Sequence, residues 1–171
     1  MPSLSHVNYG KWAEAGVPHK GWYPVGDVED LGNPELTCEM CERQEVRYVQ
    51  TMAHGNYPSV LRVGCVCAGK MEEDPAAART RERLRRSKTQ RRERWTESGW
   101  KHSRRGNQFK STSDGFHVVV KVNDDGTWGG VISDSVTSKK HWSKKKHKDA
   151  IEAKLAAFDA IPLLKKKWRL S

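Results

Sequence analysis

The chain has 171 residues, of which 36% are hydrophobic and 30% are charged. This composition disfavours one large core and predicts one domain or two small ones, and no apolar run approaches the roughly 20 residues that span a bilayer. The net charge of +10 is uneven, because residues 1–69 carry five Lys and Arg against eight Asp and Glu, whereas residues 70–171 carry 26 against 13. The basic part favours nucleic acid as the partner, and neither a membrane nor a small-molecule substrate is inferred.

The first segment, residues 1–37, places aromatic side chains among glycines and prolines, a pattern typical of neither helix nor strand. We expect an extended segment whose aromatic residues pack over the region that follows, with a binding groove as the alternative. The polar residues directly after Met1-Pro2-Ser3-Leu4 predict that no signal peptide is present. A reducing, cytoplasmic location is therefore expected.

All four cysteines lie within residues 38–71, in two close pairs. Cys38 and Cys41 form the first pair, and Cys65 and Cys67 form the second after 23 intervening residues. Two such pairs can supply the four thiolates of a tetrahedral zinc site. The sequence therefore predicts one Zn²⁺, and its role should be structural because four thiolates leave no position for water.

The residues between the two pairs support a zinc ribbon. Residues 45–52 and 59–64 have the composition of strands and flank a turn at 54–58, which predicts a β-hairpin that returns the second pair to the first. The alternatives are two disulfides, free thiols or an iron–sulfur cluster. His54 and His19 are weaker substitute ligands. A reducing location disfavours disulfides, and the long hairpin favours zinc over iron.

Residues 72–95 predict a long basic helix. Asp74 and Pro75 suit its N-terminus, and nothing from Ala76 to Trp95 interrupts it. A helix that is polar all round has no face to bury, so it either is solvated as a linker or contacts an anion such as a phosphate. Its candidate nucleic-acid ligands are Arg79, Arg83, Arg85, Arg86, Arg91, Arg92 and Arg94.

Residues 96–113 form a basic linker of unassigned conformation, with Arg104 and Arg105 as further candidate ligands. Residues 114–162 then predict a module of three strands and one helix, in which Pro162 ends the helix and residues 163–171 form a basic tail. The expected fold class is therefore α+β: a Cys₄ zinc ribbon, a long basic helix, and a three-stranded antiparallel sheet with one helix.

The alternation along the first strand of this module predicts its two faces. Its inward side chains are Phe116, Val118, Val120 and Val122, and its outward side chains are His117, Val119 and Lys121. A helical stripe of Ile151, Leu155, Phe158 and Ile161 should cover the inner face. On the third strand, Lys139 and His141 are expected outside, with Lys140 as a further nucleic-acid candidate. Trp128 is assigned to the core, and a stacking platform for an unpaired base is its alternative.

Two resemblances extend these expectations. Residues 36–71, with Cys38-Glu39-Met40-Cys41 and Val63-Gly64-Cys65-Val66-Cys67-Ala68-Gly69, resemble a family of uncharacterised bacterial zinc-ribbon proteins, which implies no assigned activity. Residues 114–162, with Trp128-Gly129-Gly130 and a helix rich in alanine, resemble plant ethylene-response-factor DNA-binding domains and the arm-binding domains of phage integrases. The resemblance implies a sheet that lies in the major groove of duplex DNA. Ser138-Lys139-Lys140 before that helix also resembles double-stranded RNA-binding domains.

The residues favour a binder rather than an enzyme. No nucleophile-elbow pattern and no phosphate-binding glycine loop are present, and the His–Asn neighbours at 54–56 and 102–107 lack the paired histidines of an HNH-type nuclease. The expected function is nucleic-acid binding through phosphate contacts, with duplex DNA favoured over RNA. The main alternative is a protein–protein adaptor or accessory subunit of a nucleic-acid-processing complex.

Overall fold

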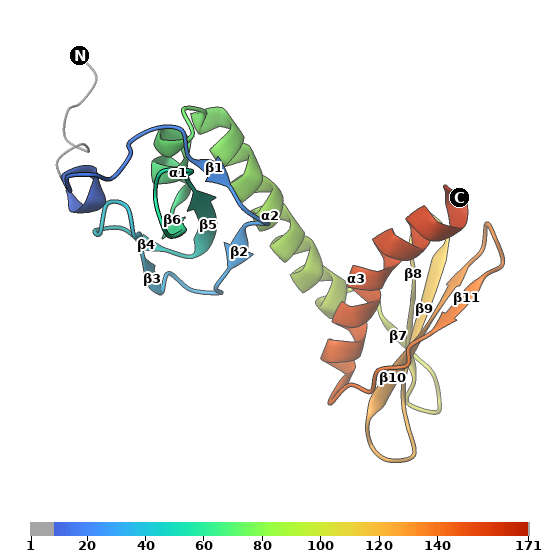
Figure 1. Ribbon diagram of the computed structural model, residues 1–171. Helices are drawn as coiled ribbons and strands as arrows, with labels where there is room; N and C mark the ends of the chain where they lie inside the picture. Colours follow the sequence, from blue (N-terminus) through green and yellow to red (C-terminus); the bar gives the residue numbers. More distant parts are fainter. Residues whose placement is uncertain (1–8, 171) are drawn as a thin grey trace. The chain divides into compact units, whose positions relative to one another are not determined.

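The computed structural model describes residues 9–170 and confirms the mixed α+β class (Figure 1). The chain forms two compact units, Met1–Thr89 (unit 1) and Gln90–Ser171 (unit 2). Among the described residues, no helix combines the length and the apolar character that crossing a membrane requires.

Unit 1 is built around β5 (Tyr48–Ala53), which pairs antiparallel with three other strands. Its partners are β1 (Tyr23–Pro24), β2 (Glu29–Asp30) and β6 (Leu61–Val63). A separate small ladder joins β3 (Leu36–Thr37) to β4 (Glu45–Val46). The β5–β6 pair is the predicted hairpin between the two cysteine pairs.

The N-terminal segment packs onto unit 1 through its tryptophans, as its composition predicts. Trp12, in the short 3₁₀ helix η2 (Gly10–Trp12), and Trp22 are both buried in a core that also contains Met40 and Met52. The Trp22 indole N–H donates a 2.7 Å hydrogen bond to the Pro18 carbonyl, so the polar edge of this buried ring is satisfied.

The second cysteine pair opens a helix, α1 (Cys65–Met71), where a ribbon would have a second loop. Gly64 is its N-cap in an extended conformation, and the amide of Ala68 donates to the Gly64 carbonyl at 2.9 Å. Ala68 and Met71 are both fully buried, a spacing that belongs to one helix face. Burial of this face explains why the chain turns helical at the second pair.

The predicted basic helix is present as α2 (Pro75–Glu97) and begins where expected. Asp74 Oδ1 accepts the Ala77 amide at 3.0 Å, which satisfies one of the free donors at the helix start. Ala78 is fully buried, and its carbonyl accepts a 2.9 Å hydrogen bond from Gln50 Nε2. This part of α2 is thus packed into unit 1 and is not a solvated linker.

Unit 2 contains a five-stranded antiparallel sheet in the order β11-β10-β9-β8-β7, so the prediction of three strands was too small. The strands are β7 (Lys101–His102), β8 (Gln108–Ser111), β9 (Phe116–Val122), β10 (Trp128–Asp134) and β11 (Lys140–Trp142). The two added strands come from residues 96–113, which carry too few apolar residues to give a strand pattern. Backbone hydrogen bonds are enough to hold such short strands: β8 pairs with β9, and the edge strand β7 pairs with β8.

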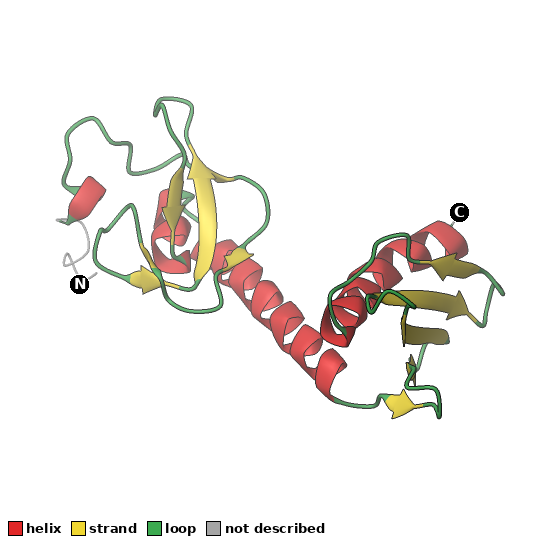
Figure 2. Ribbon diagram, turned by 90° about the horizontal axis from the view of Figure 1, so that it is seen from below, coloured by secondary structure: helices red, strands yellow, loops and turns green. Residues whose placement is uncertain are grey.

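Helix α3 (Ala150–Arg169) lies across one face of this sheet (Figures 1 and 2). It buries Ala153, Ala157 and Leu164, whereas Ile151 is 57% exposed. The predicted stripe is therefore rotated, because the small alanine side chains take the centre and let the helix approach closely. Phe158 and Ile161 are half-buried at its margin.

Pro162 lies inside α3 and does not end it, contrary to the prediction, so the expected basic tail is mostly helical. A proline in a helix interior loses one hydrogen bond and is normally destabilising. Here contacts beyond it hold the last turns in place. Arg169 donates to both carboxylate oxygens of the buried Asp134, and the Trp168 ring stacks on Phe116 with centroids 6.4 Å apart.

Candidate metal centre and candidate nucleic-acid surface

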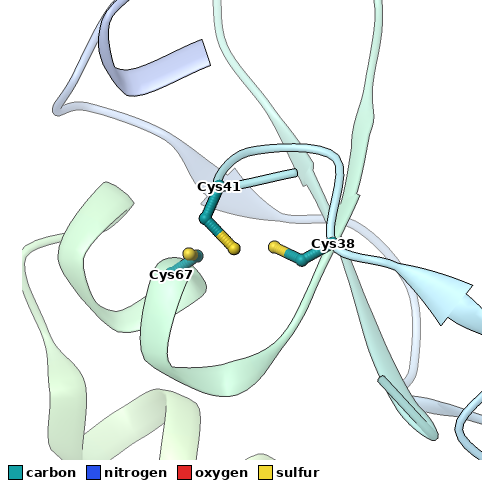
Figure 3. A group of neighbouring side chains, drawn as sticks. All are labelled: Cys38, Cys41 and Cys67. Carbon is teal, nitrogen blue, oxygen red and sulfur yellow. The ribbon is translucent and has the colours of Figure 1, made fainter. Parts of the chain in front are cut away.

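Three of the four cysteines converge in the core of unit 1. Cys38 and Cys41 come from the turn between β3 and β4, and Cys67 comes from α1 (Figure 3). Their sulfur atoms all lie within 4.8 Å of one another. Tetrahedral zinc with Zn–S bonds of about 2.3 Å would place sulfurs about 3.8 Å apart, so the three sulfurs are close enough to hold one metal ion after a small adjustment.

Backbone hydrogen bonds fix the turn that carries the first pair. The Cys38 amide donates to the Gln44 carbonyl at 2.7 Å, and the Glu42 amide donates back to the Cys38 carbonyl at 2.7 Å. Gly10 of η2 lies so close that a Cβ atom there would approach the Cys41 carbonyl carbon to 2.7 Å, and its φ is +57°. The N-terminal segment can cover the cluster only because this residue is a glycine.

The surroundings of Cys38 favour a thiolate. Its pKa falls to about 5, first because the Cys67 thiol donates a hydrogen bond to it and then because the amides of Cys41, Gly64 and Met40 do the same. Burial opposes this shift. The pKa of Cys67 is raised, chiefly because it keeps the shared proton. Amide donors that converge on one sulfur are the arrangement expected around a metal-bound thiolate.

Cys65 does not belong to the cluster. Residues two apart on a helix point about 200° apart, so Cys65 and Cys67 cannot both face the first pair while α1 is intact. The Cys65 thiol instead donates a hydrogen bond to the Glu82 carboxylate on α2. The pKa of Cys65 rises to about 11, first because the thiol is partly buried and then because of Glu82. The set of four cysteine ligands therefore stays a prediction, with three members assembled.

The two histidines considered as substitutes are outside the cluster as well. His19 lies edge-on to Trp12 with ring centroids 5.4 Å apart. His54 Nε2 is 2.9 Å from the Lys20 carbonyl oxygen, and its Nδ1 accepts the Asn56 amide. Both rings thus have other contacts in unit 1.

The basic residues of α2 divide into two groups. Arg86 pairs with Glu82 and lies 4.7 Å from the Tyr48 ring centroid, and Arg92 pairs with Asp159 at 3.0 Å. These two candidates are therefore engaged within the protein. Arg85 is half-buried. The exposed candidates, for which the described residues offer no hydrogen bond or ion pair to the side chain, are Arg79, Arg83, Arg91 and Arg94.

In unit 2, the face of the sheet opposite α3 (the outer face) bears a continuous row of apolar side chains. The register places Phe109, Val119, Val131 and Trp142 side by side on β8 to β11, and we refer to them as the apolar row. Lys101 continues the row onto β7. The predicted inward residues Phe116, Val118 and Val120 are buried on the other side, which confirms the predicted phase of β9.

Basic groups flank this row. On β11 the sequence prediction was wrong by one residue, because it placed Lys139 and His141 on the outer face. Lys140 and Trp142 face outward, because they pair with Ser133 and Val131, whereas His141 pairs with Ile132 and lies on the α3 side. Lys139 precedes β11. Trp142 was missed for this reason: the sequence carries no signal that fixes its face, whereas in the structure its ring is 59% exposed.

The outer face has one sign of charge. Lys121 Nζ lies 5.4 Å from the centroid of the Trp142 ring, and His117 lies beside Phe109 with centroids 5.9 Å apart. No carboxylate occupies an outward position on β8 to β11. Arg104 and Arg105 are exposed in the turn that joins β7 to β8. Trp128 packs against the core, in agreement with its assigned place.

Comparison of the chain with protein-family models, curated proteins and solved structures gives no significant match. The resemblance of residues 36–71 to uncharacterised bacterial zinc-ribbon proteins stays a prediction. The same holds for the likeness of residues 114–162 to plant and phage DNA-binding domains. The function is accordingly inferred from the side chains described above.

Proposed function

We propose that this protein binds nucleic acid through the outer face of the sheet in unit 2, while unit 1 is stabilised by a zinc ion. The observation that carries the proposal is the apolar row, which ends in the exposed ring of Trp142 and is flanked by Lys101, Lys121 and Lys140. Aromatic rings stack on bases, and lysines neutralise phosphates. The absence of outward carboxylates on β8 to β11 matches an anionic partner.

The proposed zinc ligands are Cys38, Cys41 and Cys67. These three ligands leave one tetrahedral position for a further group. The structural role of the ion can therefore no longer be argued from a complete set of four thiolates. The burial of the ligands supports a structural role instead: Cys38 is 1% exposed and Cys67 is 6% exposed, in the core that contains Met40. A metal at this point crosslinks the β3–β4 turn to α1, which is a structural role.

Metal content tests this part. Purified Cys38→Ser protein should lose its zinc, whereas Cys65→Ser should keep about one zinc per chain, since the Cys65 thiol contacts Glu82. Elemental analysis of both variants is the measurement. Loss of zinc from Cys65→Ser would show that all four cysteines bind the ion, and iron with visible absorbance in the wild type would exclude zinc.

Salt-dependent binding tests the surface. The full chain should bind labelled oligonucleotides with a log–log salt slope that reflects its phosphate contacts, about −0.9 per contact on duplex and about −0.7 on single strands. The double variant Lys121→Gln with Lys140→Gln should remove one to two phosphate contacts, which would reduce the magnitude of the slope by about 0.9 per contact on duplex. Lys166→Gln, an exposed lysine of α3, removes the same kind of charge elsewhere and should leave it unchanged. A wild-type chain that binds no nucleic acid at low salt would favour the adaptor.

A further inference from the structure

An open pocket of about 480 Å³ lies at one end of the outer face, where β9, β10 and β11 meet the loop after β11. Its lining includes Lys121, Gly129, Trp142, Lys144 and Lys145. The volume falls within the range of about 300 to 1,000 Å³ that small-ligand sites occupy. We refer to it as the Trp142 pocket.

One residue that lines this pocket, Gly129, is a glycine that the fold does not require. Gly129 is outside the positive-φ region, and a Cβ atom there would meet only the Asn123 side-chain amide, at 3.6 Å. Neither backbone strain nor close packing excludes a larger side chain at this position. The glycine leaves the space beside the Trp142 ring open.

The walls of the pocket combine an aromatic face with cations. Trp142 is exposed on the edge strand β11. Lys144 and Lys145 follow in the next loop, are exposed, and have no side-chain partner in the described part of the chain. The lining also includes two carboxylates, Asp124 and Asp125, of which Asp125 is paired with Lys146 at 2.5 Å.

We propose that the Trp142 pocket holds one unpaired nucleotide of the bound strand, with its base stacked on the indole and its phosphate against Lys144 and Lys145. This inference rests on the proposed function and specifies its ligand. A base inside a duplex has both faces covered by its neighbours, so a ring on the sheet edge can stack only on a base that is unpaired or displaced. Duplex DNA, favoured by the resemblance, would contact the lysines of the outer face through its phosphates without filling this pocket.

The test uses full-length protein and three probes: a labelled oligothymidylate, a matched duplex, and a strand of equal length whose central residues are abasic. Trp142→Ala should weaken oligothymidylate binding by about 5- to 150-fold, the range for loss of one base–aromatic stack. Binding to the duplex and to the abasic strand should change less than about twofold. Gly129→Leu adds a side chain inside the pocket without removing a charge or a ring. It should likewise weaken binding to oligothymidylate while binding to the duplex and to the abasic strand changes little.

Controls separate this inference from the proposed function. Thermal melting should show that both variants fold, and Lys121→Gln with Lys140→Gln should weaken binding to all three probes through phosphates. If the wild type binds nucleic acid but neither variant affects oligothymidylate selectively, the pocket assignment is wrong and the proposed surface stands. If the wild type binds none of the probes at low salt, the proposed function fails and the pocket assignment fails with it.

Discussion

Unit 1 and unit 2 stabilise small cores in different ways. Apart from β5, the strands of unit 1 that lie within residues 9–89 have only two or three residues each, and the buried core of this unit contains two cysteines and three methionines. In unit 2, β9 and β10 have seven residues each and pair along their full length, under a long helix. The turn of Cys38 and Cys41 is flanked only by the two-residue strands β3 and β4. The comparison motivates the proposal that a metal ion supports unit 1, where strand pairing is short, in place of the long ladder that supports unit 2.

Removal of the proposed zinc should produce the largest difference in stability between unit 1 and unit 2. A chelator, or Cys38→Ser, should unfold unit 1, because the binding free energy of a structural zinc is folding free energy, about 10 to 16 kcal/mol in zinc-finger peptides. Amide exchange should then become fast at Val49 and Val63 and stay slow at Val118 and Val120. If the Val49 amide exchanges equally slowly with and without metal, unit 1 does not depend on a metal ion for its fold.

A cavity in the core of unit 2 should destabilise unit 2 and leave unit 1 folded. Phe116 is fully buried and contacts the Trp168 ring, so Phe116→Ala should lower the free energy of unfolding of unit 2 by about 3 to 5 kcal/mol. Calorimetry should show one transition shifted, with zinc content unchanged. Val122→Ala, at a 46% exposed position of the same strand, is the matched control and should cost little.

The smallest expected effect is at the start of α3. The Asp149 side chain accepts the Glu152 amide at 2.8 Å, and Asp149→Ala should lower the stability of unit 2 by about 1 kcal/mol. Asp149→Asn should retain most of it, since asparagine also caps helices well. Chemical denaturation followed by helix content is the measurement, and a loss as large as that of Phe116→Ala would mean that α3, rather than the sheet, governs unit 2.

Much of this organisation could be predicted where neighbouring residues decide it. Alternation set the phase of β9, and Asp74 followed by Pro75 marked the start of α2, because both signals are local. The cysteine spacing identified a cluster. It could not show that Cys65 points away, since that depends on the burial of Ala68 and Met71, which makes α1 a helix.

Other features depend on contacts distant in sequence. Strand β8 pairs with β9, and β7 in turn pairs with β8, and no pattern in residues 96–113 indicates these backbone partners. Pro162 is tolerated because Arg169 reaches Asp134, far away in the chain. The phase of β11 was misjudged because Lys140, His141 and Trp142 contain no apolar alternation that would fix it.

The boundary between the two units, after Thr89, falls inside helix α2 rather than in a loop. Proteases bind extended backbone and cut preferentially at exposed loop tips, so the dense trypsin sites of α2 are protected for as long as the helix is formed. Tryptic cleavage within α2 therefore reports its local unfolding. Since Ala78 belongs to the core of unit 1 and Trp95 to that of unit 2, the position of the first cut would reveal which unit releases its end of the helix first.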